Sequence, residues 1–248
     1  MLPILQIGPF ALQTPGLILL IGLWIALSIG EKQAPRFKIT ADLLYNLVFY
    51  SLAAGVLGAR LGYAARFPQA FAASPGSLLS LNPGLLDLNS AIAVGLVSGL
   101  IYGQRKGLRL RPTLDALTPV LAVLAIALAM ANAASGKAFG AASELPWAIQ
   151  LWGAMRHPTQ IYQLLAAGWI AWCVAPSRTE NQQPEGTLFT KFVIYSAAAH
   201  LFLEAFRGDS ILLPNGWRST QVLAWSILAI GLWAYGRLQY PNHTEAAK

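Results

Sequence analysis

The sequence predicts an all-α membrane protein whose chain crosses the bilayer several times. Apolar residues make up 56% of the 248 residues and charged residues only 11%, whereas soluble domains average about 45–50% and 25%. The mean hydropathy is +0.52. Several uncharged stretches reach the roughly 20 residues that a helix needs to cross a hydrocarbon core of about 30 Å. These features exclude an ordinary soluble enzyme, although the chain length alone would allow one.

Seven hydrophobic segments follow one another, without the alternation that is typical of β-barrel strands. Because a backbone in lipid must satisfy its own hydrogen bonds, we expect each segment to be a helix. The expected helices cover residues 14–30, 43–65, 89–103, 113–133, 159–175, 187–206 and 219–236. They form one domain over residues 1–238, and a short polar tail follows at 239–248.

Individual segments carry their own signals. No basic residue precedes the first one, so we interpret it as a membrane helix with Pro15 in its opening turn, not as a cleaved signal peptide. The third is short unless it begins before Asn89. The small residues at 95, 99 and 103, and those at 132, 136 and 140, recur at helical spacing and predict close helix packing.

The basic residues predict the orientation in the membrane, because cytoplasmic loops carry more Lys and Arg. With the N-terminus outside, the cytoplasmic side holds Lys32, Arg36, Lys38, Arg105, Lys106, Arg109, Arg111, Arg178, Lys191, Arg237 and Lys248. The outer side then holds Arg60, Arg66, Lys137, Arg156, Arg207 and Arg218. The bias favours an N-terminus outside and a C-terminus in the cytoplasm. It also explains the basic stretch QRKGLRLR, so we expect no nucleic-acid partner.

Polar groups at membrane depth are costly and mark candidate functional residues. Apart from Asp115, they are expected near the outer leaflet: Arg60, Asn132, Lys137, Arg156, His157, His200, Glu204 and Arg207. A basic cavity there would suit the phosphate of a lipid headgroup, which arginine binds with two parallel hydrogen bonds. Each residue also has a structural interpretation, such as snorkelling for Arg156 or an i, i+3 ion pair between Glu204 and Arg207.

Several of these residues lie in motifs that resemble one family. RHPTQIY at 156–162 is similar to RHPSQLYE of the phosphatidylglycerol–prolipoprotein diacylglyceryl transferases, and IGPFAL at 7–12 resembles their IGPLAI opening. Residues 60–63 match the end of GGRLGY, and residues 204–207 resemble EFFR. The resemblance runs from about residue 7 to 235, and it implies seven helices with the N-terminus outside.

The resemblance also implies a reaction in the cytoplasmic (inner) membrane of a bacterium. These enzymes move a diacylglyceryl group from phosphatidylglycerol to the lipobox cysteine of a preprolipoprotein and release glycerol phosphate, without a cofactor or a metal. By this resemblance, Arg60, Arg156 and Arg207 would bind the lipid phosphate and Asn132 would orient a lipid oxygen. His157 or His200 would be the catalytic base, with Glu204 in the same site.

Five positions depart from the family pattern in chemical type. The histidine of the family's FHGGLIG segment corresponds to Asn89, and the signature arginine and glutamate correspond to Ala129 and Lys137. Pro15 stands where the family has tyrosine, and His200 where it has arginine. Since an amide cannot take up a proton at neutral pH, Asn89 cannot replace a histidine base.

Three interpretations follow from the sequence. The chain is a lipid transferase with a rearranged site, or a catalytically silent relative that acts as a lipid-binding or structural subunit beside other membrane subunits, or a small transporter. The transporter is disfavoured, because the two halves lack corresponding helices broken by Gly or Pro. A cavity shared by His157 or His200 with Arg60 and Arg207 would favour the transferase. If Lys137 and His200 are sealed in packed protein or face lipid, the silent subunit is favoured.

Overall fold

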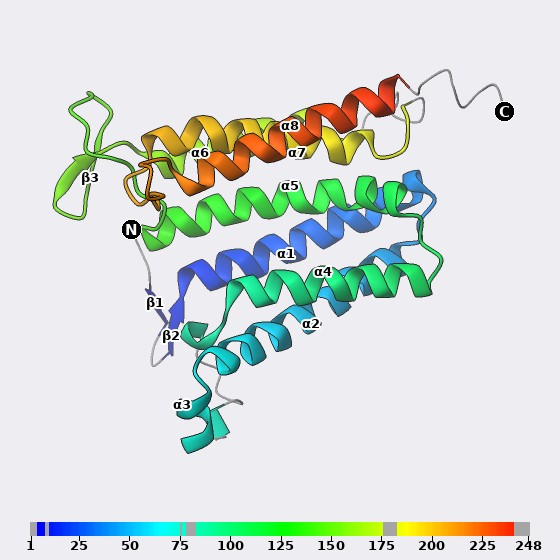
Figure 1. The fold of residues 1–248 in the computed structure, drawn as a ribbon, viewed down its shortest axis with the longest axis horizontal. Coiled ribbons are helices and arrows are strands. Elements are labelled where there is room, and N and C mark those ends of the chain that lie inside the picture. Colours follow the sequence, from blue (N-terminus) through cyan, green and yellow to red (C-terminus); the bar gives the residue numbers. More distant parts are fainter. Residues whose placement is uncertain (1–3, 8–9, 75, 78–82, 176–182, 241–248) are drawn as a thin grey trace.

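Long helices dominate the fold (Figure 1). The computed structural model describes residues 4–7, 10–74, 76–77, 83–175 and 183–240. The elements in chain order are β1 (Ile4–Ile7), β2 (Phe10–Gln13), α1 (Thr14–Gln33), α2 (Ala41–Arg66), α3 (Pro68–Ala73), α4 (Leu88–Arg105), α5 (Leu110–Ser135), β3 (Ile149–Leu151), β4 (Ala154–Arg156), α6 (Thr159–Cys173), α7 (Thr187–Leu203) and α8 (Ser219–Gln239). Short 3₁₀ turns lie at Ala34–Phe37, Pro83–Leu85 and Glu204–Phe206.

Each of the seven predicted segments is a helix: α1, α2, α4, α5, α6, α7 and α8. The third segment, α4, begins at Leu88 and is capped by the carboxylate of Asp87, so it does begin before Asn89. Pro15 occupies the first turn of α1, as expected. The residues of the predicted tail from 241 onward, and residues 8 and 9 of the IGPFAL motif, lie outside the described part of the chain.

Successive long helices run in opposite directions, as Figure 1 shows. Helices α1, α4, α6 and α8 begin at the end of the bundle where α2, α5 and α7 end; we call this end the site end. Residues near the ends of α2, α5 and α7 therefore lie together with residues near the starts of α6 and α8. The polar candidates other than Asp115 thus lie near the site end, and their place near the outer leaflet stays a prediction, as does the orientation in a membrane.

Length and composition support a membrane location for part of this bundle. Within the described residues, four helical spans are long and apolar enough to cross a bilayer: Thr14–Phe37, Ala41–Arg66, Leu110–Ser135 and Thr187–Phe206. Many large apolar side chains on the helices are exposed, including Trp24 (71%), Trp172 (76%) and Trp233 (65%). Exposed apolar surface of this extent is typical of proteins that face lipid. Whether all seven helices cross the membrane stays a prediction.

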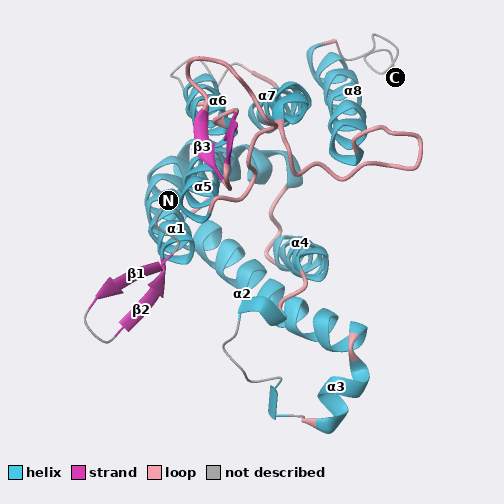
Figure 2. Ribbon diagram, turned by 90° about the vertical axis from the view of Figure 1, so that its left-hand side faces the viewer, coloured by secondary structure: helices cyan, strands magenta, loops and turns pink. Residues whose placement is uncertain are grey.

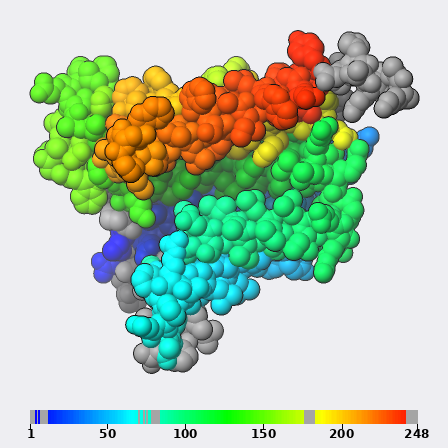
Figure 3. Space-filling model, in the orientation of Figure 1, coloured from blue at the N-terminus to red at the C-terminus, as the bar shows by residue number. Residues whose placement is uncertain are grey.

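The helices form three groups (Figures 1 and 2). Helices α1 and α5 lie in the middle, with α2 and α4 on one side and α6, α7 and α8 on the other. In the space-filling view, α8 and α4 stand forward on one face and α5 is set back between them (Figure 3). Ala26, Leu44, Ala116 and Val120 form the buried core where α1, α2 and α5 meet.

Small residues bring the helices close together. A Cβ atom on Gly22 or Gly30 of α1 would collide with Ala127 or Val120 of α5. Between α2 and α4, Gly55 and Gly95 approach each other backbone to backbone. Backbones that approach so closely gain van der Waals contact that larger residues would prevent. The predicted packing role of small residues is therefore confirmed for Gly95, and Gly99 likewise packs against Ser51 of α2.

Two short hairpins were not predicted. The first pairs β1 with β2, and the second pairs Ile149 with Arg156 at the site end. Its turn is formed by Trp152 and Gly153, both with positive φ, which is the conformation of a tight type I′ turn. The indole N–H of Trp152 donates to the carbonyl oxygen of Gly136, 3.2 Å away. This contact attaches the second hairpin to the end of α5.

The contact between α1 and α5 generates a prediction. We expect Gly22→Ala to destabilise the protein by about 1–3 kcal/mol, because the added methyl group overpacks the contact with Ala127. Gly16→Ala in the same helix is the matched control, since a Cβ there meets nothing within 4 Å and alanine is the better helix former. Thermal unfolding in detergent measures both. An unfolding temperature of Gly22→Ala at or above that of Gly16→Ala would contradict the packing.

Candidate functional site

An extended segment after α5 organises the site end. Helix α5 ends at Ser135, and the residue after it, Gly136, has a φ of 72°, the left-handed conformation that is common after a helix C-terminus. Residues 139–142, which we call the central segment, then run between two other stretches of backbone. On one side the N–H of Ala141 donates to the carbonyl oxygen of Phe206 (2.8 Å), and the N–H of Gly208 donates to the carbonyl oxygen of Phe139 (2.9 Å). On the other side the N–H of His157 donates to Ala141 (3.0 Å).

This arrangement requires glycine at two positions. A Cβ on Gly140 would collide with the carbonyl oxygen of His157, and one on Gly208 would lie 2.7 Å from the carbonyl oxygen of Gly140. The three backbones can therefore approach closely only without side chains there. The sequence interpretation of residues 132, 136 and 140 as one helical ridge is wrong, because the helix ends at Ser135. Gly140 instead serves the contact between loops.

Arg207 follows the 3₁₀ turn at the end of α7 and is half-buried. Its Nε and Nη2 donate to the two carboxylate oxygens of Asp209 at 2.9 and 3.0 Å. Its Nη1 lies 3.4 Å from Oε2 of Glu204, which is only 2% exposed. The hydrogen bonds from Arg207 to Asp209, together with the charge of Glu204, raise the pKa of Arg207 above its usual range. The guanidinium is therefore a permanent cation held between two carboxylates.

Glu204 and the loop after it are held by residues near the start of α8. The hydroxyl of Thr220 donates to Oε1 of Glu204. Nη1 of Arg218 donates to the carbonyl oxygens of Glu204 and Arg207 and to the hydroxyl of Ser210. Neither Arg218 nor Thr220 was a predicted site residue. The polar stretch RSTQ at 218–221, before an apolar run, was the only signal in the sequence.

Arg156 lies on the other side of the central segment, at the end of β4. Its Nε donates to the carbonyl oxygen of Leu151 (3.1 Å) and its Nη1 to that of Gly140 (3.2 Å). The guanidinium lies 5.0 Å from the centre of the Phe139 ring, within the range of a cation–π interaction. Arg156 is only partly buried. The central segment thus brings Arg156 and Arg207, which are 51 residues apart in the chain, to its two sides.

His157 faces an apolar cavity of about 530 Å³ between α6 and α7. The cavity is lined by Leu145, Trp147, His157, Tyr162, Leu165, Ala166, Ala199, Phe202, Leu203 and Phe206. The imidazole lies against the ring of Phe206, with 5.3 Å between centroids. Its Nδ1 is buried and makes no hydrogen bond to the described residues. A buried polar atom without a partner is costly, so it is a candidate for contact with a ligand.

The other predicted site residues are spread over the site end. Asn132 of α5 donates to Gln163 of α6 at 3.5 Å. His200 lies on α7, one turn before Glu204, and is exposed. Arg60 is 8% exposed and donates to the carbonyl oxygens of Leu85 and Ser77. It belongs to α2, which is separated from α7 by α1 and α5 (Figure 2). The apolar cavity is lined by His157 without Arg60, Arg207 or His200.

The positions that depart from the family pattern also differ in environment. Ala129 is 4% exposed and buried in α5, whereas Lys137 and Asn89 are exposed. The backbone oxygen of Lys137 accepts a hydrogen bond from Gln160. The lysine side chain at the position of the family's glutamate therefore lies on the surface of the site end.

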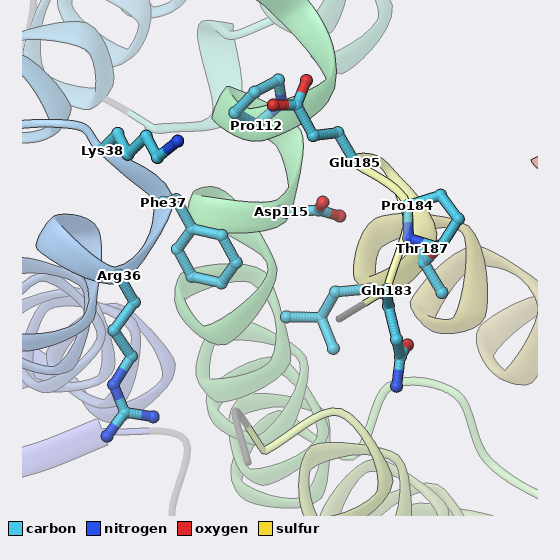
Figure 4. A pocket seen from close by; sticks show the side chains of 10 residues that line it. Arg36, Phe37, Lys38, Pro112, Asp115, Gln183, Pro184, Glu185 and Thr187 are labelled. Carbon is cyan, nitrogen blue, oxygen red and sulfur yellow. The ribbon is translucent and has the colours of Figure 1, made fainter. Parts of the chain in front are cut away.

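A second pocket lies at the opposite end of the bundle (Figure 4). Its centre is Asp115 of α5, whose carboxylate accepts backbone hydrogen bonds from Gly186 (2.5 Å) and Phe189 (2.9 Å) at the start of α7. Lys38 points towards Asp115, and Arg36 points away from it (Figure 4). A carboxylate that accepts the first N–H groups of a helix acts as a cap. Asp115 therefore has a structural role at the start of α7.

No metal site is evident in the described part of the chain, where no three His, Cys, Asp or Glu residues are grouped. The expectation that no cofactor is needed stays a prediction.

The fold and the site end define a class: a helical membrane protein with arginines, a histidine and an apolar cavity gathered at one end. Comparison with known proteins specifies the class further. The family model of prolipoprotein diacylglyceryl transferase matches residues 3–236. The protein therefore belongs to the prolipoprotein diacylglyceryl transferase family.

Curated relatives agree with this assignment. The phosphatidylglycerol–prolipoprotein diacylglyceryl transferase of Gloeobacter violaceus is 28% identical over 250 alignment positions, and the alignment covers 94% of this chain and 92% of that protein. The corresponding protein of Legionella pneumophila strain Corby is 26% identical, and the alignment covers 92% of this chain and 93% of that protein. For the protein of Bordetella parapertussis the identity is 26%, and the alignment covers 82% of this chain and 80% of that protein. The transferase and lipoprotein-biosynthesis assignments made from the motifs are confirmed at the level of the family.

The start of α4 generates a pH prediction. Hydrogen bonds from Ser90, and then the charge of Arg66, hold the pKa of Asp87 below its usual 3.8. A carboxylate with a lowered pKa in the folded state stabilises the fold above its unfolded pKa, and this stabilisation is lost as the pH falls through the folded value. We expect Asp87→Ala to lower the thermal stability at pH 7, and the difference from wild type to shrink below about pH 4. Asp42→Ala at the opposite end is the control, and a difference that is constant with pH would contradict the ion pair.

Proposed function

We propose that the protein transfers a diacylglyceryl group from phosphatidylglycerol to the cysteine thiol of a prolipoprotein. Membership of the family and the names of the curated relatives support the reaction class. The observation that carries the proposal is the pairing around the central segment. In this pairing the backbones of Arg156 and Arg207 bind to the two sides of the central segment. His157 then lines an apolar cavity, and its Nδ1 has no partner among the described residues.

The charge changes of the reaction explain why arginines are needed. The cysteine thiolate attacks the glyceryl carbon that carries the phosphate ester, the carbon–oxygen bond breaks, and glycerol phosphate leaves with the electron pair. The single negative charge of the thiolate thus ends on the phosphate, which becomes a dianion. Cationic groups near the phosphate stabilise the transition state more than the bound lipid, because the charge develops there.

Each candidate residue has a role in this proposal. Arg156 and Arg207 bind the phosphate, and Glu204 holds Arg207 in position. His157 accepts the proton of the thiol, because it lines the cavity and its Nδ1 has no hydrogen-bond partner among the described residues; the exposed His200 is the alternative base. Asn132 orients an oxygen of the lipid. Arg60 contributes only if the lipid headgroup reaches α2. No cofactor or metal takes part.

The apolar cavity gives the acyl chains a place beside the reacting atoms. Its lining is almost entirely apolar, and it lies between α6 and α7. An acyl chain could therefore enter it from the bilayer without crossing water. We further propose that the chain lies in the cytoplasmic (inner) membrane of a bacterium and crosses it seven times, with the N-terminus and the site end outside. The excess of basic residues at the opposite end supports this orientation.

A catalytically silent, lipid-binding subunit of a membrane assembly is the second candidate. It is favoured by the contacts of the arginines, because Arg207 is already bound by Asp209 and Glu204 while Arg60 donates to backbone carbonyls. The exposed position of His200 and the replacement of five family residues also favour it. This candidate predicts bound phosphatidylglycerol without transfer, together with other membrane subunits that co-purify.

Transfer itself is the decisive measurement. We expect purified protein in phosphatidylglycerol liposomes to add a diacylglyceryl group to a lipobox peptide, as read from the peptide mass. A known enzyme of the family serves as the positive control. Bound phosphatidylglycerol without any added mass, beside an active control, would reject the proposal in favour of the silent subunit.

The same assay distinguishes the two histidines. We expect His157→Gln to lower the rate by about 10²–10⁴, the usual contribution of a general base, and His200→Gln to leave most of the activity. Both variants remove one imidazole from the same end of the bundle. Thermal unfolding shows whether they remain folded. Loss of transfer in a folded His200→Gln, with an active His157→Gln, would move the base to α7.

Lipid binding tests the arginines separately from catalysis. We expect Arg156→Ala to reduce the amount of phosphatidylglycerol that remains bound in native mass spectrometry more than Arg36→Ala does. The reason is that Arg156 contacts the central segment at the site end, whereas Arg36 lines the pocket at the opposite end. Arg156→Lys keeps the charge and should bind an intermediate amount, because lysine lacks the planar pair of donors. Equal losses in the two alanine variants would contradict a phosphate site at Arg156.

A further inference from the structure

Asp209 has a contact with Arg207 that the proposed reaction does not use. The carboxylate oxygens of Asp209 accept two parallel hydrogen bonds, from Nε (2.9 Å) and Nη2 (3.0 Å) of Arg207. This two-bond geometry is also the geometry with which arginine binds a phosphate group. Asp209 therefore occupies one edge of the guanidinium that a lipid phosphate would use.

The two carboxylates around Arg207 are held very differently. Glu204 is 2% exposed, and its side chain also accepts a hydrogen bond from Thr220. Asp209 is 26% exposed, and Arg207 is the one partner of its carboxylate in the described part of the chain. Glu204 is thus fixed in the protein, whereas Asp209 can leave Arg207 for water at the cost of one partly exposed ion pair.

The backbones of Arg207 and Asp209 are also held differently. Arg207 pairs with Gly140 of the central segment, and the N–H of Gly208 donates to Phe139. Asp209 follows directly after this pairing, at the start of the loop that leads to α8. The backbone of Arg207 is therefore held by contacts in which Asp209 takes no part.

We infer that Asp209 is an internal counter-ion whose place on Arg207 the lipid phosphate takes, so that this residue sets the affinity for the phospholipid. The inference rests on the proposed role of Arg207 in the proposed function. When glycerol phosphate leaves, the carboxylate of Asp209 binds Arg207 again. The charge of Arg207 is thus neutralised by Asp209 before the lipid binds and again after glycerol phosphate leaves.

Asp209→Asn tests the inference, because it removes the charge and keeps the shape of the side chain. We expect its apparent Kd for phosphatidylglycerol, measured by native mass spectrometry, to fall roughly fivefold, the scale of one partly exposed ion pair. Binding of diacylglycerol, which has no phosphate, should not change. Asp209→Glu keeps the charge and should bind phosphatidylglycerol like the wild type, and Asp42→Asn controls for the change in net charge.

The direction of the effect separates this role from a structural one. If Asp209 only positioned Arg207, Asp209→Asn would bind phosphatidylglycerol more weakly, and such a result would overturn the inference. Equal gains in affinity for diacylglycerol, or in Asp42→Asn, would overturn it as well. The binding assay needs no turnover. Tighter binding by Asp209→Asn in a protein that transfers nothing would therefore reject the proposed transferase while the inference stands.

Discussion

The close approach of three backbone stretches at the central segment is the constraint on which the site depends. Gly140 lies between the backbones of His157 and Gly208, and no larger residue fits there. Because the three stretches follow α5, precede α6 and follow α7, their pairing fixes the relative position of three helix ends. Two arginines that are distant in sequence thereby reach opposite sides of one strand-like segment.

The positive charges of the arginines at the site end are balanced by neighbouring groups of the protein. Arg207 has two carboxylate neighbours, and Arg156 donates to two carbonyl oxygens and lies over an aromatic ring. A cation near lipid needs such partners, since leaving it uncompensated would cost several kcal/mol. The same partners limit how strongly the arginines can bind anything else. The affinity of the site for a phosphate is thus a difference between the new contacts and the contacts that are given up.

The helices could be predicted from sequence, and most of the polar contacts could not. Long apolar segments bounded by charged residues define helices by composition alone, and the seven segments agree with the structure within a few residues. The i, i+3 spacing of Glu204 and Arg207 likewise predicted their ion pair. By contrast, Asp209 and Arg218 act through a loop without periodic pattern. The extended path of Gly140 follows from long-range backbone pairing, which a helical spacing of glycines does not reveal.

The cap of α7 has a consequence for how the protein is made. The carboxylate that accepts the first N–H groups of α7 comes from Asp115 of α5, about 70 residues earlier in the chain. Synthesis proceeds from the N-terminus, so this acceptor has already been synthesised when the residues of α7 leave the ribosome. The residue before α7 is Gly186, which has no side chain that could cap the helix. The N–H groups of its first turn therefore gain the Asp115 carboxylate as their acceptor only when α7 packs against α5. Correct folding of α7 thus requires that α5 is inserted before it.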